Sequence, residues 1–242
     1  MAVHLKRAMV LAGGLGLRMR PLTLDMPKPL VTLAGKALLD HVLDRLADAG
    51  IETAVVNVHY LPEQIERHVA DRKSPKVLIS DEREQLLDTG GGVMKALKLL
   101  GPDPFVICNS DSISIPANSA SLARLTAEFD SEKMECLMLL ATAANSIGYD
   151  GNGDFHMTPD GLLKRRRERE IAPFAFTGTS IAHPRLFKAA PKGPFSLNRL
   201  WDEAIEARRL YGIRQDGQWM HLGSPAALRE AEQLLGAGET YF

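Results

Sequence analysis

The sequence predicts an α/β fold built on a doubly wound, mostly parallel (Rossmann-like) sheet, and three observations support this. Apolar runs of strand length alternate with amphipathic stretches of helix length through the first half of the chain. The first apolar run ends directly in glycines, as is typical of the carboxyl edge of such a sheet. After residue 135 the apolar runs lie closer together and are more polar, which favours a small antiparallel addition.

The hydrophobic periods predict the individual elements in order. The expected strands are Ala8–Ala12, Ala54–Val58, Lys76–Ser80, Phe105–Asn109, Glu135–Thr142, Phe174–Ala182 and Trp219–Leu222. The expected helices are Ala37–Ala49, Pro62–Arg72, Val93–Leu100, Ala120–Phe129, Leu197–Arg208 and Pro225–Leu235. In the first of these helices the apolar residues recur every three or four positions and form one stripe, which Gly50 ends. Strand, helix, strand order implies right-handed crossovers, with ligands at the carboxyl ends of the strands.

Composition and charge narrow the class of protein. With 242 residues, of which 45% are hydrophobic, the chain can bury a full core, so disorder and fibrous structure are excluded. The net charge of −1 provides no basic field for nucleic acid or an anionic membrane surface. Cys108 and Cys136 lie in apolar runs and indicate reduced core thiols, and no run approaches the ~18 apolar residues of a membrane span. We therefore expect a soluble, cytoplasmic protein without a signal peptide. No pattern in the sequence indicates its oligomeric state.

The stretch RAMVLAGGLGLRMRPLTLDMPKPL, residues 7–30, indicates an anion-binding site. Its glycines lack Cβ atoms directly after a strand, so backbone N–H groups can approach a phosphate closely. Arg18 and Arg20 follow, and Lys28 stands between two prolines, so several cations are expected to converge on the loop. A tight structural turn would explain the glycines alone, and the spacing fits neither the P-loop nor the dinucleotide fingerprint. The added cations favour phosphate binding.

Three later positions offer further candidates. In LLDTGGGV, residues 86–93, glycines precede a predicted helix and either expose backbone donors to a flat ring or phosphate or form a flexible cap. Asp111 follows an apolar strand, where a lone carboxylate suits Mg²⁺ but can also form a turn. Gly178 would allow a ring to approach its strand closely, unless that strand belongs only to the core.

In combination these motifs resemble the sugar-phosphate nucleotidyltransferase family. The matching segments, in the family's order, are LAGGLGLRMRPLT with PKPL, LLDTGGGV, ICNSDS, FTGTSIAHPRLF and GQWMHLGSPAAL. The chain is most similar to short bacterial members that act on N-acetylmuramic acid 1-phosphate in cell-wall recycling, which similarly have a TGGG segment and a GDF stretch. The resemblance implies a GT-A-like nucleotidyltransferase fold as a single domain over residues 1–242. Residues 1–115 would form its nucleotide-binding half and residues 116–242 its sugar-binding half.

The resemblance also implies roles for individual residues. Arg18 would clamp the β- and γ-phosphates of a nucleoside triphosphate, Lys28 would lie beside the α-phosphate, and Asp111 would hold a bridging Mg²⁺. The attacking sugar phosphate is already ionised, so catalysis would consist of positioning and charge neutralisation. The implied nucleotide-binding residues are Leu11, Ala12, Gly13, Gly14, Gly16, Thr89 and Gly90, and the implied sugar-binding residues are Asn109, Gly153, Asp154 and Gly178.

Two positions depart from the family pattern. His221, in WMHLG, stands where the family usually has a second metal-binding aspartate, and imidazole suits Mn²⁺ better than Mg²⁺. His221 therefore either binds metal with an altered preference, contacts phosphate, or is a buried core histidine. Leu17 stands where a small hydroxyl residue is more frequent, which removes one possible hydrogen bond to phosphate.

The implied reaction joins a nucleoside triphosphate to a sugar 1-phosphate and releases pyrophosphate, with UTP and N-acetylmuramic acid 1-phosphate favoured. Mg²⁺ would be the cofactor, and His221 also leaves room for Mn²⁺. The alternatives are a guanylyltransferase for mannose or heptose 1-phosphate, a thymidylyltransferase for glucose 1-phosphate, and a non-catalytic sensor of nucleotide sugars. The charge run LLKRRRERE, residues 162–170, is interpreted as a solvated strand end or loop rather than a binding patch.

Overall fold

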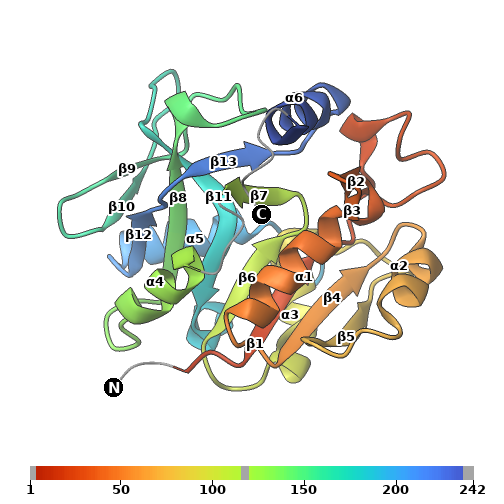
Figure 1. Ribbon diagram of the computed structural model, residues 1–242. Helices are drawn as coiled ribbons and strands as arrows, with labels where there is room; N and C mark the ends of the chain where they lie inside the picture. The colour runs from red at the N-terminus through yellow and green to blue at the C-terminus, as the bar shows by residue number, and fades with distance from the viewer. Residues whose placement is uncertain (1–3, 116–119, 237–242) are drawn as a thin grey trace.

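The centre of the molecule is one nine-stranded sheet (Figure 1). This computed structural model describes residues 4–115 and 120–236, so small parts of both predicted halves, residues 1–3, 116–119 and 237–242, lie outside it. The first half contributes parallel strands in the order β5 (Lys76–Asp81), β4 (Thr53–Val58), β1 (Arg7–Leu11) and β6 (Phe105–Asn109). The second half adds β8 (Cys136–Thr142), β9 (Phe155–Met157), β10 (Leu163–Arg165), β11 (Phe174–Ala182) and β12 (Leu210–Arg214). Because β11 is antiparallel to β6 and β8, the predicted antiparallel addition is confirmed.

Helices cover both faces of this sheet (Figure 1). One face carries α1 (Leu38–Asp48), α2 (Pro62–Val69) and α4 (Ala120–Glu128), and the other carries α3 (Asp88–Leu100) and α5 (Leu197–Glu206). Side chains alternate along β1: Ala8 and Val10 pack with the first group of helices, and Met9 packs with the second. The doubly wound arrangement expected from the sequence is therefore present.

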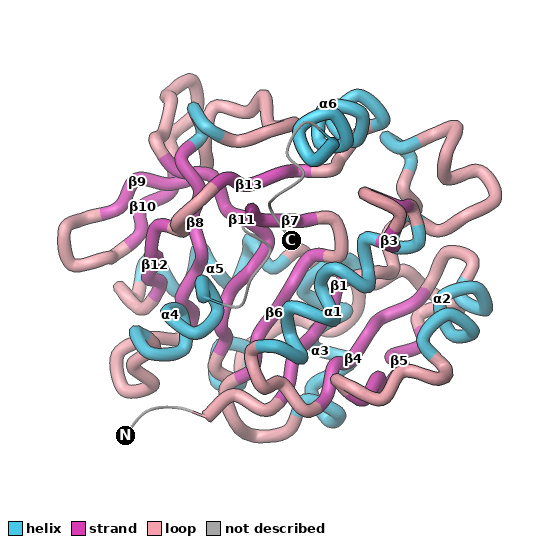
Figure 2. Tube along the Cα trace, viewed as in Figure 1, coloured by secondary structure: helices cyan, strands magenta, loops and turns pink. Residues whose placement is uncertain are grey.

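A third cluster of buried side chains lies beyond the carboxyl end of β6. There β7 (Ser112–Ile115) pairs antiparallel with β13 (Gln218–His221), and the hairpin of β2 (Thr32–Leu33) and β3 (Lys36–Ala37) packs against α6 (Pro225–Gly236). Met19, Leu33, Met220 and Leu235 share the cluster. Figure 2 shows α6, β13 and β7 together at one end of the sheet. This cluster fixes the chain segments that follow the glycine loop.

The elements missed from sequence are short. Strands β2, β3, β7, β9, β10 and β12 have two to five residues, and they lack the run of four apolar residues that indicated the equally short β1 and β6. The 3₁₀ segments Leu17–Met19, Lys28–Leu30, Ala143–Asn145 and Pro184–Phe187 were likewise not predicted. Most ends of the predicted elements differ by a few residues. The largest difference concerns α3, which begins at Asp88 rather than Val93.

Both cysteines are free and buried, as predicted. Burial raises the pKa of Cys136 to about 12 and also raises the pKa of Cys108, so both thiols stay protonated at neutral pH. Within the described ranges, no helix combines the length and the apolar character that crossing a membrane requires.

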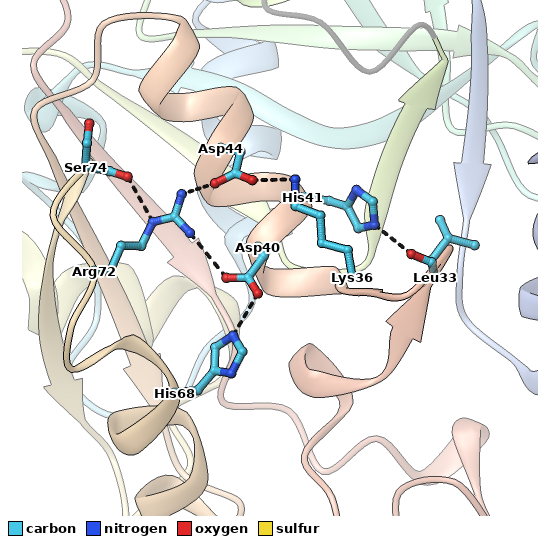
Figure 3. Close-up of polar contacts among 8 residues, drawn as sticks. All are labelled: Leu33, Lys36, Asp40, His41, Asp44, His68, Arg72 and Ser74. Carbon is cyan, nitrogen blue, oxygen red and sulfur yellow. Dashed lines mark hydrogen bonds and ion pairs between the residues drawn. The ribbon is translucent and has the colours of Figure 1, made fainter. Parts of the chain in front are cut away.

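A network of charged side chains anchors the β2–β3 hairpin to α1 and α2 (Figure 3). Asp44 of α1 pairs with Lys36 of β3 and with Arg72, which follows α2. Asp40, one turn earlier in α1, accepts from Arg72 Nη1 at 3.2 Å and pairs with His68 Nε2 at 2.8 Å. The 3₁₀ turn Lys28–Leu30 precedes the hairpin and also packs against α1, so α1 contacts both the segment that carries Lys28 and the hairpin.

Asp44→Asn should lower the free energy of unfolding at neutral pH by about 1 kcal/mol or less, because the Asp44 side chain is 42% exposed and ion pairs near the surface contribute little. Burial opposes ionisation of Asp44, but hydrogen bonds from Lys36 and Arg72 outweigh it and lower its pKa. The folded-state pKa lies below the unfolded one, so this stabilisation is present above the unfolded value and disappears as pH falls through the folded value.

Urea unfolding of both proteins from about pH 7 down to about pH 3 measures the effect. The difference in stability should narrow as the pH falls. A difference that stays constant over the whole range would contradict the assignment.

Candidate active site

Most of the predicted site residues line one cleft of about 720 Å³. Its walls contain Leu11, Ala12, Gly13, Gly14, Gly16, Leu17, Arg18, Lys28, Thr89, Asn109 and Asp111. The parallel pairing of β1 with β6 sets Leu11 opposite Asn109, so the glycine loop and the segment with Asp111 leave the sheet side by side. The cleft therefore lies at the carboxyl ends of parallel strands, where the sequence predicted a ligand site.

An ion pair between Lys28 and Asp111 forms part of the cleft wall. Lys28 Nζ donates to Asp111 Oδ2 at 2.5 Å, and the two side chains are only 13% and 16% exposed. Lys28 begins a 3₁₀ turn after Pro27, and Asp111 directly precedes β7. Among the described residues, no hydrogen bond is donated to the other carboxylate oxygen, Oδ1, which remains available to a ligand.

Asn57 and Glu82, which sequence reasoning missed, hold the glycine loop in place, and Asn57 also lines the cleft. Asn57 Oδ1 accepts from the backbone N–H of Ala12 at 2.8 Å, and Asn57 Nδ2 donates to Glu82 Oε1 at 2.9 Å. Glu82 Oε2 accepts from the N–H of Leu87, at the start of α3. Both side chains are buried, and a polar residue at the end of an apolar strand was the available signal. The chain of hydrogen bonds links the loop to α3.

The glycines of the loop meet different requirements. Gly16 has φ +63°, and a Cβ there would lie 3.1 Å from Thr23 Cγ2 and 3.2 Å from Lys28 Cβ. A Cβ on Gly14 would meet nothing within 4 Å, so that glycine leaves the cleft open. The buried Thr23 donates to the carbonyl of Gly16 at 2.7 Å and fastens the RPLT segment to the loop. The loop is thus closely packed at Gly16 and open at Gly14.

Two of the three predicted cations converge on the cleft. Arg18 and Lys28 line it, whereas Arg20 is exposed and is not part of its walls. The expectation for Arg20 is therefore wrong, because the 3₁₀ turn Leu17–Met19 ends before it and turns its side chain to solvent.

His221 lies beside Asp111 through the β7–β13 ladder, in which it is opposite Ser112. It is not part of the cleft wall but lies behind Gly223, where a Cβ would be 2.7 Å from His221 Nε2 and 3.4 Å from Arg18 Nη1. Burial lowers the pKa of His221, and Lys28 and Arg18 add to that effect while Asp111 opposes it. The imidazole is therefore neutral at neutral pH and can act as a ligand or as a hydrogen-bond acceptor.

The TGGG segment is the first part of α3 and not a loop before the helix, which corrects the interpretation of its glycines. The N–H groups of Gly90 and Gly91 both donate to the carbonyl of Phe195, at 2.8 and 3.1 Å. A Cβ on Gly90 would lie 2.3 Å from the Phe195 ring, and one on Gly91 2.5 Å from the Gly193 carbonyl. These glycines allow residues 193–195 to pack on the helix, so their amides are not free for a base or phosphate.

A second cavity of about 280 Å³ adjoins the cleft, and Leu11, Asp88, Thr89 and Asn109 line both. Its remaining walls include Asp154, Phe155, Arg165, Phe176, Asn198 and Trp201. Asp154 Oδ2 accepts from the N–H of Phe176 at 2.8 Å, which orients the carboxylate. The residues predicted for the sugar thus meet here in part, since Asn109 and Asp154 line this cavity.

Gly153 and Gly178 do not line either cavity. Gly178 has φ +82°, and a Cβ there would lie 2.8 Å from Asn109 Nδ2. A Cβ on Gly153 would lie 2.1 Å from the Ala172 carbonyl. In this structure both glycines allow close packing behind the cavity wall, and Gly178 makes room for the Asn109 side chain rather than for a ring.

The charge run 162–170 is a strand end, β10, followed by a loop, as interpreted from sequence. Arg165 differs from the rest of the run because it lines the second cavity. Sequence reasoning missed this residue, since a run of charges does not reveal which member faces inward.

The candidate metal ligands are few. In the ranges 4–115 and 120–236 no group of three or more His, Cys, Asp or Glu side chains could hold a metal ion. Asp111, with one carboxylate oxygen available, and the neighbouring His221 fit an ion that takes its other ligands from phosphates and water.

Gly90→Ala should lower the free energy of unfolding by about 1–3 kcal/mol, because its Cβ would overlap the Phe195 ring. Gly14→Ala is the matched control, since open space surrounds that position and stability should be unchanged or slightly higher. Thermal unfolding of the two variants measures both effects. Equal midpoints would show that the close packing at α3 contributes nothing.

The chain is similar to known proteins both in sequence and in fold. Residues 7–149 match the family model described as "Nucleotidyl transferase". The chain is 46% identical to "N-acetylmuramate alpha-1-phosphate uridylyltransferase" of Caulobacter vibrioides, over 95% of this chain and 97% of the relative. It is 33% identical to the protein of the same name from Neisseria meningitidis serogroup B, over 96% and 99%. The solved structure "UDP-glucose pyrophosphorylase complexed with UDP-glucose" shares the fold, with a TM-score of 0.78 at 15% identity over 97% and 99% of the two chains. The chain therefore belongs to the sugar-phosphate nucleotidyltransferase family, as its motifs indicate.

Proposed function

We propose that this protein transfers a uridylyl group from UTP to N-acetylmuramic acid 1-phosphate and releases pyrophosphate. The observation that carries the proposal is the Lys28–Asp111 ion pair, which lies in one cleft with an open glycine loop and Arg18. The choice of UTP and of this sugar is supported by two relatives of nearly equal length whose names state that activity.

The main obstacle to the reaction is repulsion between two anions. An oxygen of the sugar phosphate attacks the α-phosphorus of UTP, and the bond between that phosphorus and the bridging oxygen of the β-phosphate breaks. Arg18 would bind the β- and γ-phosphates and Lys28 the α-phosphate, so that each side chain compensates charge where it accumulates. Asp111 would hold the Lys28 ammonium in place, and no protein nucleophile is needed.

The nucleotide would lie along the first cleft. The open backbone at Gly14 and its neighbours Gly13 and Gly16 would donate N–H groups to the triphosphate. Leu11, Ala12 and Thr89 would form the wall around the nucleoside. Gly90 would contribute by shape alone, since its N–H already donates to Phe195.

The sugar would occupy the second cavity. Asn109 and Asp154 would bind its hydroxyl or amide groups, and Gly153 and Gly178 would shape the wall behind them. The sugar would therefore contact both predicted halves of the chain, since Asn109 belongs to residues 1–115 and Asp154 to residues 116–242. The expected cytoplasmic location is supported by two free, buried cysteines.

A divalent cation fits the site through Asp111. When bound, Mg²⁺ or Mn²⁺ would neutralise phosphate charge and align the reacting groups. Asp111 would offer its free oxygen as a ligand, and the neutral His221 would offer a nitrogen.

The proposed substrates can be tested directly. Purified protein is assayed for pyrophosphate release with ATP, GTP, CTP, UTP and dTTP against a panel of sugar 1-phosphates, with Mg²⁺ or Mn²⁺. We expect turnover with UTP and N-acetylmuramic acid 1-phosphate. Preference for GTP with a mannose- or heptose-type phosphate would keep the chemistry and overturn the substrates. Binding of a nucleotide sugar without turnover would instead indicate a sensor.

Asp111→Asn should reduce kcat by at least about 100-fold, because the variant loses the carboxylate that orients Lys28 and would hold the cation. Asp25→Asn, at an exposed carboxylate on the segment that follows the glycine loop, is the control and should retain full activity. Circular dichroism verifies that both variants fold. Undiminished turnover in a folded Asp111→Asn variant would refute the assignment.

A further inference from the structure

The cavity proposed for the sugar contains a positively charged side chain, Arg165, which binding of an uncharged sugar does not require. Among its lining residues, Arg165 is the one cation, and Asp88 and Asp154 are the carboxylates. Hydroxyl and amide groups of a sugar are satisfied by carboxylates, amides and hydroxyls. A guanidinium in such a wall is most effective against a carboxylate or phosphate, which it binds through two parallel hydrogen bonds.

Arg165 is held in place from two sides. It ends β10, which packs beside α5 (Figure 1), and its Nε donates to Asp202 Oδ1 of that helix at 2.5 Å. Its Nη2 donates to Asn198 Oδ1 at 3.3 Å. The guanidinium carbon lies 5.1 Å from the centre of the Phe155 ring, an aromatic residue in the same cavity wall. The position of the group is therefore defined before a ligand binds.

The fixed guanidinium still has donors to offer. Within the described part of the chain it makes two hydrogen bonds, which leaves three of its five N–H groups for a ligand. The pair with Asp202 is partly exposed, at 33% and 53%, and such a pair adds little to stability. Stability alone is thus a weak reason for an arginine in this wall.

We infer that Arg165 binds the carboxylate of an acidic sugar 1-phosphate and so selects it over the neutral sugar. The inference rests on the proposed function, in which the sugar is N-acetylmuramic acid, which carries a carboxylate on a lactyl ether. N-acetylglucosamine has the same ring and acetamido group without that ether. Asp88 and Asp154 repel the carboxylate from the rest of the wall, so only the region at Arg165 accepts it.

The test compares two sugars in wild type and three variants. The sugars are N-acetylmuramic acid 1-phosphate and N-acetylglucosamine 1-phosphate, each with UTP, and kcat/KM is measured for both. The variants are Arg165→Gln, Arg165→Lys and, as matched control, Arg167→Gln. Arg167 belongs to the same charge run, is 73% exposed and does not line the cavity.

For Arg165→Gln, the preference for the acidic sugar should fall by about 10- to 100-fold, mainly through KM, as expected for loss of a charged hydrogen bond. The kcat/KM for the neutral sugar should stay within about threefold or rise, since the variant removes no contact that this sugar needs. Arg165→Lys keeps the positive charge but cannot form two parallel hydrogen bonds to one carboxylate. Its preference for the acidic sugar should therefore lie between those of wild type and Arg165→Gln. Arg167→Gln should behave as wild type.

The outcomes separate this inference from the proposed function. If wild type uses the acidic sugar but Arg165→Gln lowers kcat/KM for both sugars equally, or for neither, Arg165 is structural and only the inference fails. If wild type itself prefers the neutral sugar or another nucleotide, the proposed function fails and the inference fails with it. A selective loss for the acidic sugar, absent in Arg167→Gln, supports both.

Discussion

The parallel pairing of β1 with β6 is the constraint on which the site depends. Its register places Leu11 beside Asn109, so two segments far apart in sequence leave the sheet at the same edge. One of them becomes the glycine loop, and the other becomes the turn with Asp111. The ion pair of Asp111 with Lys28 closes the arrangement, since it joins the segment after the loop to the end of β6. Transfer of a phosphoryl group requires charged side chains in fixed positions. Here the pairing of β1 with β6 brings Asp111 and the glycine loop to the same edge of the sheet.

The structure is closely packed where the glycine loop is linked to α3, and it is open where Gly14 borders the cleft. Asn57 and Glu82 join the loop to α3 through buried hydrogen bonds, and the glycines at the start of α3 let residues 193–195 lie directly on the helix. Gly14 has the opposite surroundings, with no atom near the position of a Cβ. Glycine therefore permits close packing at α3 and leaves space for a ligand at the cleft.

Charge is distributed along the cavities in a manner that fits the proposed substrates. Arg18 and Lys28 face the cleft assigned to the phosphates, while Asp154 and Arg165 lie in the adjoining cavity assigned to the sugar. His221 stays neutral beside the two cations, because burial and their charge both disfavour its protonation. The net charge of −1 does not indicate this local arrangement. The electrostatic effect of each charged group depends mainly on the groups within a few ångströms of it.

The amino-acid sequence by itself determined the long elements and most of the residues that line the first cleft. Hydrophobic periods of sufficient length predicted the main strands and helices, and the glycine loop with Arg18, Lys28 and Asp111 was evident from motif order. Only the tertiary structure decided that the TGGG glycines serve packing, that Arg20 points away, and that Asn57, Glu82 and Arg165 line or support the two cavities. These features depend on contacts between distant segments, such as Gly90 with Phe195 or Arg165 with α5, which local periodicity does not contain.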